Sequence, residues 1–97
     1  MPKAYWVISH RSTRSPEKFA AFTKLAYPAV HAAGGRFLVR TSKVAEVHEA
    51  GVADRTVVVE FDSLEQALAA YRTPAYKDAL AAMGDGAERD VRIVEGV

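Results

Sequence analysis

Cysteine is absent from this 97-residue chain, which excludes disulfide bonds, thiolate metal sites and a cysteine nucleophile. An excess of charge of one sign is also absent, because the chain has 13 Lys and Arg and 12 Asp and Glu, for a net charge of +1. No segment concentrates basic residues between aromatic ones, so we expect neither nucleic acid nor an anionic membrane as a partner. Long apolar runs and a signal-peptide core are missing too. Together these absences predict a cytoplasmic protein.

The composition that remains, 49% hydrophobic and 26% charged, is typical of a globular protein. A chain of this length forms one domain, which we expect over residues 1–97. Its most apolar stretch, residues 56–61, is a run of β-branched and aromatic side chains that predicts a buried strand. Ser63 and Gln66 then form a capping box, which predicts the start of a helix.

Three further strands are predicted over residues 4–9, 36–41 and 90–95, and the second of these segments alternates with period two. Residues 43–46 extend the second of these strands after an irregularity. The polar segment 10–14 is expected to be a connection to the first helix.

Two regions carry the 3.6-residue periodicity of helices. The first begins with the capping residue Ser15 and ends at Gly34, and Pro28 inside it predicts a kink or a split. The second region holds two apolar stripes that are out of phase by about 140° on one straight helix. Thr73 and Pro74 lie between these stripes and carry the cap and proline of a new helix start. Two short helices are therefore favoured over one.

The resulting order, βαββαβ, predicts an α+β protein with the ferredoxin-like split fold. Its sheet is four-stranded and antiparallel, with the first and third strands in the middle. Strand parity separates two faces of this sheet. The face expected under the helices is wholly apolar and comprises Trp6, Ile8, Phe37, Val39, Val57, Val59, Phe61, Val91 and Ile93. The opposite face is mixed and comprises Tyr5, Val7, Ser9, Arg36, Leu38, Arg40, Thr56, Val58, Glu60, Arg92 and Val94.

The apolar members of the second face predict a homodimer. The helices of the βαββαβ order cover only one face of the sheet, and leaving each large apolar side chain of the other face in water forgoes about 1.5–3 kcal/mol. A second copy packed face to face would bury them, and the polar members of the face would then line an enclosed interior. The dimer would thus form a dimeric α+β barrel.

Four segments in order carry a family resemblance: residues 34–40, 57–65, 71–76 and 93–96, with the sequences GGRFLVR, VVVEFDSLE, YRTPAY and IVEG. They resemble the domain of unknown function 1330 family of the dimeric α+β barrel superfamily. This resemblance implies a ferredoxin-like protomer and a barrel dimer, and it implies no particular activity. Superfamily relatives include cofactor-independent monooxygenases, muconolactone isomerases and haem-binding enzymes. The chain departs from the family where members often have two glycines, because it has Thr41 and Ser42 there.

Three residues are candidates for catalysis. Arg40 and Glu60 share a parity on neighbouring strands, and they fit either an anion anchor with a general base or a structural cross-strand ion pair, which is favoured. His31 is the candidate base with a titration near neutral pH, although its helical position favours exposure.

Tyr5, Ser9 and Tyr71 are candidates for substrate binding, although a place in the core is favoured for the aromatic pair. The three histidines share no metal-ligand spacing, so no metal site is expected. A haem held by one histidine stays an open alternative, but we expect no tightly bound cofactor. Two functions follow as hypotheses: a protein that binds or transforms a small organic molecule, in the manner of a monooxygenase or isomerase, or a non-catalytic dimeric module.

Overall fold

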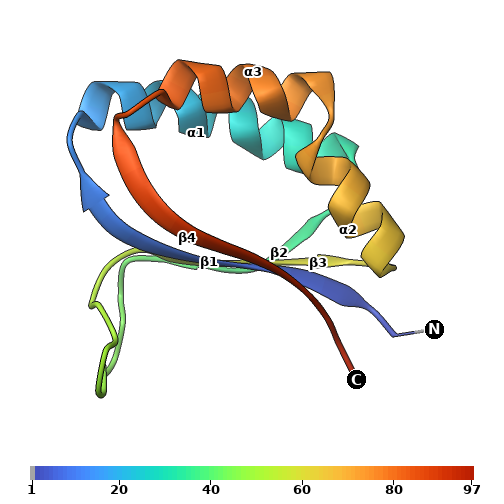
Figure 1. Cartoon of the computed structure of the whole chain (residues 1–97), viewed down its shortest axis with the longest axis horizontal. Coiled ribbons are helices and arrows are strands. Elements are labelled where there is room, and N and C mark those ends of the chain that lie inside the picture. Colours follow the sequence, from blue (N-terminus) through green and yellow to red (C-terminus); the bar gives the residue numbers. More distant parts are fainter. Residues whose placement is uncertain (1) are drawn as a thin grey trace.

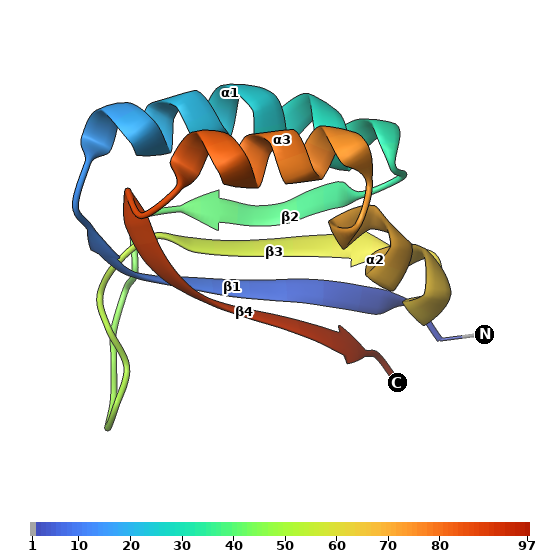
Figure 2. The ribbon, with the colours of Figure 1, turned by 45° about the horizontal axis from the view of Figure 1, so that its top comes forward.

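The computed structural model describes residues 2–97, and it confirms the ferredoxin-like α+β arrangement. Its elements are β1 (Ala4–Thr13), α1 (Pro16–Ala32), β2 (Arg36–Thr41), β3 (Thr56–Phe61), α2 (Leu64–Tyr71), α3 (Pro74–Met83) and β4 (Ala87–Glu95). The sheet is antiparallel with the order β2-β3-β1-β4 (Figure 2), so β1 and β3 lie in the middle as predicted. All three helices lie on one side of this sheet (Figure 1).

Each helix begins at the capping residue that the sequence indicates. The side-chain oxygens of Ser15, Ser63 and Thr73 each accept a hydrogen bond from the backbone N–H three residues later, at 3.1–3.2 Å. The break between α2 and α3 thus falls at Thr73, which confirms two short helices. The capping box at Ser63 differs from the usual one in its second hydrogen bond. The Gln66 side chain accepts from the backbone N–H of Asp62 at 3.0 Å, and not from that of the cap residue Ser63.

Helix α1 runs through Pro28 without the expected split. Proline removes one intrahelical hydrogen bond, namely its own to the carbonyl of Lys24. Both residues are exposed, so water replaces the missing donor and the helix continues to Ala32. Gly34 follows with a φ of 92°, a conformation that favours glycine after a helix.

Strands β1 and β4 are longer than predicted. β1 continues through residues 10–13 and β4 begins at Ala87, because the two strands pair with each other beyond their apolar parts. The register shifts between His10 and Ser12, which marks a bulge in the ladder. The predicted extension of β2 over residues 43–46 is wrong, since β2 ends at Thr41. Residues 42–55 instead project away from the helices beyond the far side of the sheet (Figure 1).

A second bulge lies within β2. Phe37 and Val39 pair with consecutive residues of β3, so Leu38 is the extra residue. One extra residue reverses the faces of all that follow. Val39 therefore lies on the side away from the helices and Arg40 on the side that they cover, the reverse of the prediction for both.

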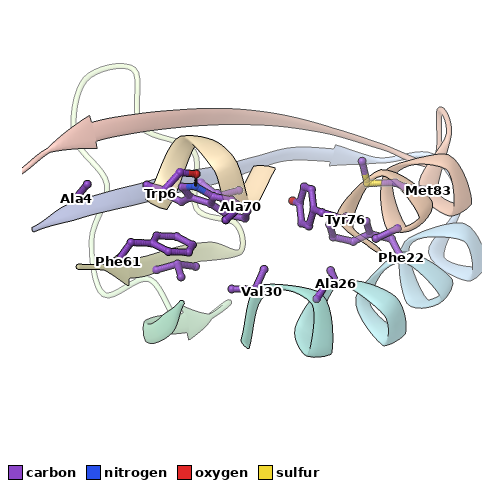
Figure 3. Packing of buried hydrophobic residues seen from close by; sticks show 14 residues of the cluster. Ala4, Trp6, Phe22, Ala26, Val30, Phe61, Ala70, Tyr76 and Met83 are labelled. Atoms are coloured by element: carbon purple, nitrogen blue, oxygen red, sulfur yellow. Dashed lines mark hydrogen bonds between the residues drawn. The ribbon is translucent and has the colours of Figure 1, made fainter. Parts of the chain in front are cut away.

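The hydrophobic core fills the space between helices and sheet. Trp6 is only 1% exposed, and its Nε1–H donates to the carbonyl of Ala67 in α2 at 2.9 Å. Its ring packs against those of Phe61 and Tyr76, at centroid distances of 5.2 and 5.0 Å. Figure 3 shows Tyr76 between Trp6 and Phe22. The aromatic residues thus connect the middle of the sheet with α1 and α3.

The other side of the sheet, here called the open face, is covered by no helix in residues 2–97 (Figure 1). Leu38 is 55% exposed and Val94 41% exposed. Val7 and Val58 are half-buried, and they pair directly across β1 and β3. The mixed and partly apolar character predicted for this face is therefore present.

Within residues 2–97, no helix combines the length and the hydropathy that crossing a bilayer requires. The cytoplasmic location expected from the sequence stays a prediction.

Candidate functional site

A cavity of about 40 Å³ lies between the sheet and the helices. A closed cavity of this volume would hold a few water molecules, but this one is partly open to solvent. Most of its walls are aromatic and aliphatic side chains from β1, β2, β3 and α1. Six wall residues carry polar side chains: His10, Thr23, Tyr27, Arg55, Tyr76 and Arg89.

Three basic residues lie in a row across the strands at this cavity. His10 of β1 pairs with Arg89 of β4 in the antiparallel ladder. On its other side, the backbone N–H of His10 donates to the carbonyl of Arg55, which directly precedes β3, at 2.9 Å. Paired residues of a ladder share a face, so Arg89 and His10 both lie under the helices. Pairing between distant parts of the chain thus assembles a basic group beside an apolar core.

His10 has one ring nitrogen without a partner. The residue is 4% exposed, and its ring packs edge-on against Phe19 at 4.8 Å. Nε2 lies 2.7 Å from the hydroxyl of Thr13, whereas buried Nδ1 has no hydrogen-bond partner in residues 2–97. A buried polar atom left unsatisfied costs about 1–3 kcal/mol. Such an atom in a cavity wall is a candidate ligand contact.

The pKa of His10 is lowered from 6.5, principally because burial disfavours the charged imidazolium. The positive charges of Arg89 and Arg55 lower it further. Asp54 and the backbone of Ser12 act in the opposite direction without overcoming these effects. His10 is therefore mainly neutral at pH 7, the form that accepts or relays a proton.

This lowered pKa predicts a pH-dependent stability. The stabilising contribution is fully present above the unfolded pKa of about 6.5 and is lost as the pH falls through the lower folded pKa, because the unfolded chain then binds the extra proton. We expect the melting temperature to fall between pH 7 and pH 5, and His10→Gln to flatten this slope. Thermal denaturation across that range measures it.

The matched control is His31→Gln, which changes an exposed histidine and should keep the wild-type slope. Asp62, Asp85 and Asp90 do not interfere, because neighbouring cations lower their pKa from 3.8 and their contribution is lost only in more acidic solution. An unchanged slope in His10→Gln would contradict the prediction.

Arg89 is held by aromatic contacts. Its guanidinium lies 4.5 Å from the ring centroid of Phe22, and Nη2 lies 3.5 Å from the hydroxyl of Tyr76. Its Nε is buried and has no hydrogen-bond partner in the described chain. Burial raises the pKa of the Tyr76 hydroxyl, while Arg89 opposes this change, so the hydroxyl keeps its proton. It therefore faces Arg89 as a neutral dipole.

Arg55 is held in a similar way, because its Nη2 donates to the hydroxyl of Tyr27 in α1. Neither Arg55 nor Arg89 forms a salt bridge with a carboxylate in residues 2–97. The cavity is consequently a positively charged site with apolar walls.

The expected pair of Arg40 and Glu60 does not form in the described chain. Glu60 lies on the open face, where it accepts from Nε of Arg36 at 2.9 Å and from the hydroxyl of Tyr5 at 3.4 Å. The β2 bulge places Arg40 on the opposite side, with its guanidinium 4.1 Å from the ring centroid of Tyr27. Arg40 thus stacks on a cavity-wall residue without lining the cavity itself.

The remaining candidates are also away from the cavity. His31 is exposed near the end of α1. Tyr71 packs against Trp6 at 5.6 Å and against Tyr76 at 5.2 Å, as a member of the aromatic core. Ser9 is exposed on the open face.

Ser9 lines a wider hollow of about 400 Å³ on the open face, between β1, β4 and the projecting segment 42–55. Arg11 and Arg92 lie in the same wall and both contact Asp90, at 3.3 and 3.2 Å. Its cations are thus partly neutralised, unlike those of the cavity. In the part of the chain that the structure describes, no cluster of three His, Asp or Glu side chains has the geometry of a metal site.

Strand parity in the sequence indicates two of the cavity residues, His10 and Arg89. Trp6 and Ile8 alternate on the helix side, and the same parity continued by two residues places His10 there. For β4, the parity of Ile93 and Val91 leads to Arg89 in the same way. The apolar pattern that predicts each strand ends before His10 and Arg89, because both side chains are polar. The pattern therefore does not show that the two strands extend to these residues.

Comparison with known proteins gives a family and a fold. The model of the family described as Domain of unknown function (DUF1330) matches residues 3–97. The chain is similar to a solved protein of unknown function from Rhodopseudomonas palustris, at 15% identity over 99% of this chain and 83% of that one, with a TM-score of 0.72. A candidate antibiotic biosynthesis monooxygenase from Caulobacter crescentus is 20% identical over 99% and 91%, with a TM-score of 0.63.

A third similar structure is a dimeric ferredoxin-like protein of unknown function from Thermobifida fusca, at 14% identity over 97% of this chain and 91% of that one, with a TM-score of 0.53. At such identities the likeness shows the fold alone. No curated protein matches the sequence significantly.

Proposed function

Because this chain belongs to the DUF1330 family, a family of unknown function, we propose its function from the site itself: the cavity binds, and through His10 transforms, a small organic molecule. The observation that carries this proposal is the pair of buried, unpartnered polar atoms in one cavity wall, Nδ1 of His10 and Nε of Arg89. A ligand with polar atoms would satisfy both, and the apolar wall would hold the rest of it. No tightly bound cofactor is part of this proposal.

The residues have distinct roles in such a site. His10 is mainly neutral near pH 7, so in the tautomer that carries its hydrogen on Nε2 it can take a proton from a bound molecule at Nδ1. Arg55 and Arg89 would stabilise the negative charge that the proton leaves behind. Tyr27 and Tyr76 hold these two cations in place through their hydroxyls. The monooxygenase description of the Caulobacter neighbour is compatible with small-molecule chemistry on this fold and names no reaction for this chain.

A thermal-shift screen with quinols, lactones and short carboxylic acids tests the proposal. A ligand at a concentration hundredfold above its Kd stabilises the folded state by about 2.7 kcal/mol, which raises the melting temperature by roughly 10 °C or more for a domain of this size. Ala26→Leu should abolish the rise, because Ala26 is a buried member of the cavity wall and leucine would fill the space.

Ala21→Leu is the matched control, because Ala21 is exposed on the same helix and its change should preserve the response. The absence of any stabilising compound for the wild type would count against the proposal. An equal response of Ala26→Leu would do the same, and a non-catalytic module would then be the better hypothesis.

We also propose that the protein is a homodimer formed through the open face. Val39 is exposed there, with exposed Leu38 next to it in the chain, and half-buried Val58 and Val7 follow Val39 across the strands. A contiguous apolar patch of this kind is unusual for a monomer. The projecting segment 42–55 contributes two further exposed valines, Val47 and Val52, which line the wide hollow on the open face. A second copy would cover this surface. The Thermobifida neighbour is described as dimeric, which supports the proposal by fold alone.

A further inference from the structure

The charge of the cavity is unbalanced. Two guanidinium groups, of Arg55 and Arg89, lie in its wall, and neither has a salt-bridge partner in residues 2–97. The histidine between them is held mainly neutral by burial. Charges away from water are ordinarily paired. Asp54 acts on His10 without forming a salt bridge with either arginine, so the site has positive charge that an anion would neutralise.

The free donors match a planar anion. Nε of Arg89 is buried without a partner, and a guanidinium presents its N–H groups as a flat fork that fits a carboxylate. If the Thr13 hydroxyl donates to Nε2 of His10 at 2.7 Å, the neutral ring carries its hydrogen on Nδ1. That nitrogen then offers a second donor from the neighbouring strand.

The size of the cavity restricts what can enter. About 40 Å³ fits a head group of a few atoms, so the rest of a larger acid would extend through the side of the cavity that is open to solvent. Phe19 and Phe22 form the apolar wall next to the two arginines. A tetrahedral phosphate needs more donors than these two free atoms supply. We propose that this cavity is a carboxylate site for a small aromatic or aliphatic acid, bound by Arg89 and His10. The proposal rests on the proposed small-molecule function and names its ligand class.

The test is a titration of ¹⁵N-labelled protein with benzoate and, separately, with benzamide, its neutral analogue of the same shape. Benzoate should shift the side-chain Nε–H resonance of Arg89 in a saturable way, and benzamide should bind at least tenfold more weakly. Arg89→Gln should weaken benzoate binding at least tenfold while keeping the melting temperature, because it removes an unpaired charge and no salt bridge.

Arg92→Gln is the matched control. Arg92 is on the same strand, its side chain is 71% exposed and it faces the other side of the sheet, so this variant should bind benzoate within twofold of the wild type. Arg89→Lys keeps the charge without the fork. It should bind more weakly than the wild type and more tightly than Arg89→Gln, and it serves as the second variant if the glutamine protein does not fold.

Each contrary result has a definite meaning. Equal binding of benzamide and benzoate, full binding by Arg89→Gln, or tighter binding of inorganic phosphate would overturn the carboxylate assignment and leave the small-molecule site in place. The same holds if neither probe binds while the thermal-shift screen finds a neutral ligand. Failure of both probes and of the whole screen would remove the proposed function together with this inference.

Discussion

Replacement of Trp6 by alanine is expected to lower the free energy of unfolding by about 3–5 kcal/mol, the usual cost of emptying a large aromatic site in a core. Trp6 is almost fully buried, and its ring contacts Phe61, Tyr71 and Tyr76. The change also leaves the carbonyl of Ala67 without its 2.9 Å donor. Domains have only about 5–15 kcal/mol of stability, so we expect a melting temperature at least about 12 °C lower, measured by circular dichroism.

Two comparison variants separate the causes. Trp6→Phe keeps an aromatic ring and loses the Nε1–H donor, so its loss of stability should be smaller. Leu25→Ala removes a partly exposed side chain of α1 and should change the melting temperature by only a few degrees. A Trp6→Ala protein that melts within a few degrees of the wild type would show that the aromatic cluster is not the centre of the core.

Val58→Asp is expected to dissociate the proposed dimer. Val58 pairs with Val7 on one side and Val39 on the other, so three valines form a row across the open face. A carboxylate buried there without a partner would cost several kcal/mol, and each 1.4 kcal/mol weakens association tenfold. We expect a dissociation constant at least 100-fold higher, measured by sedimentation equilibrium.

Ala20→Asp is the control for this variant, because Ala20 is exposed in the first turns of α1, where an acid is tolerated. It should remain dimeric. A wild-type protein that is monomeric at tens of micromolar would refute the dimer. The cavity proposal would survive that result, because the residues that line the cavity all belong to one protomer.

Local chemistry in the sequence was sufficient for the helix starts and the topology. Ser15, Ser63 and Thr73 identify the helix starts because a cap is a contact over three residues. The element order βαββαβ then leaves few possible arrangements of the sheet. The helix-covered face was also predicted correctly, apart from the end of β2.

The errors arise where a distant strand determines the outcome. The residues near Leu38 do not predict the bulge, because pairing with β3 determines it. This one extra residue places Arg40 on the opposite face of the sheet, away from Glu60. In the same way, β4 extends β1 as far as His10 and beyond. The candidate site depends on both effects, so its basic residues were missed although the fold was predicted.

The strand order has a consequence for the biosynthesis of the protein. β1 is synthesised before β3 and β4, the two strands with which it pairs. At about 5–20 residues per second, one edge of the nascent β1 stays unpaired until β4 has been synthesised. The row of His10 and Arg89 therefore forms only after β4 has been synthesised, and chains truncated before Ala87 would retain His10 without its arginine neighbour on β4.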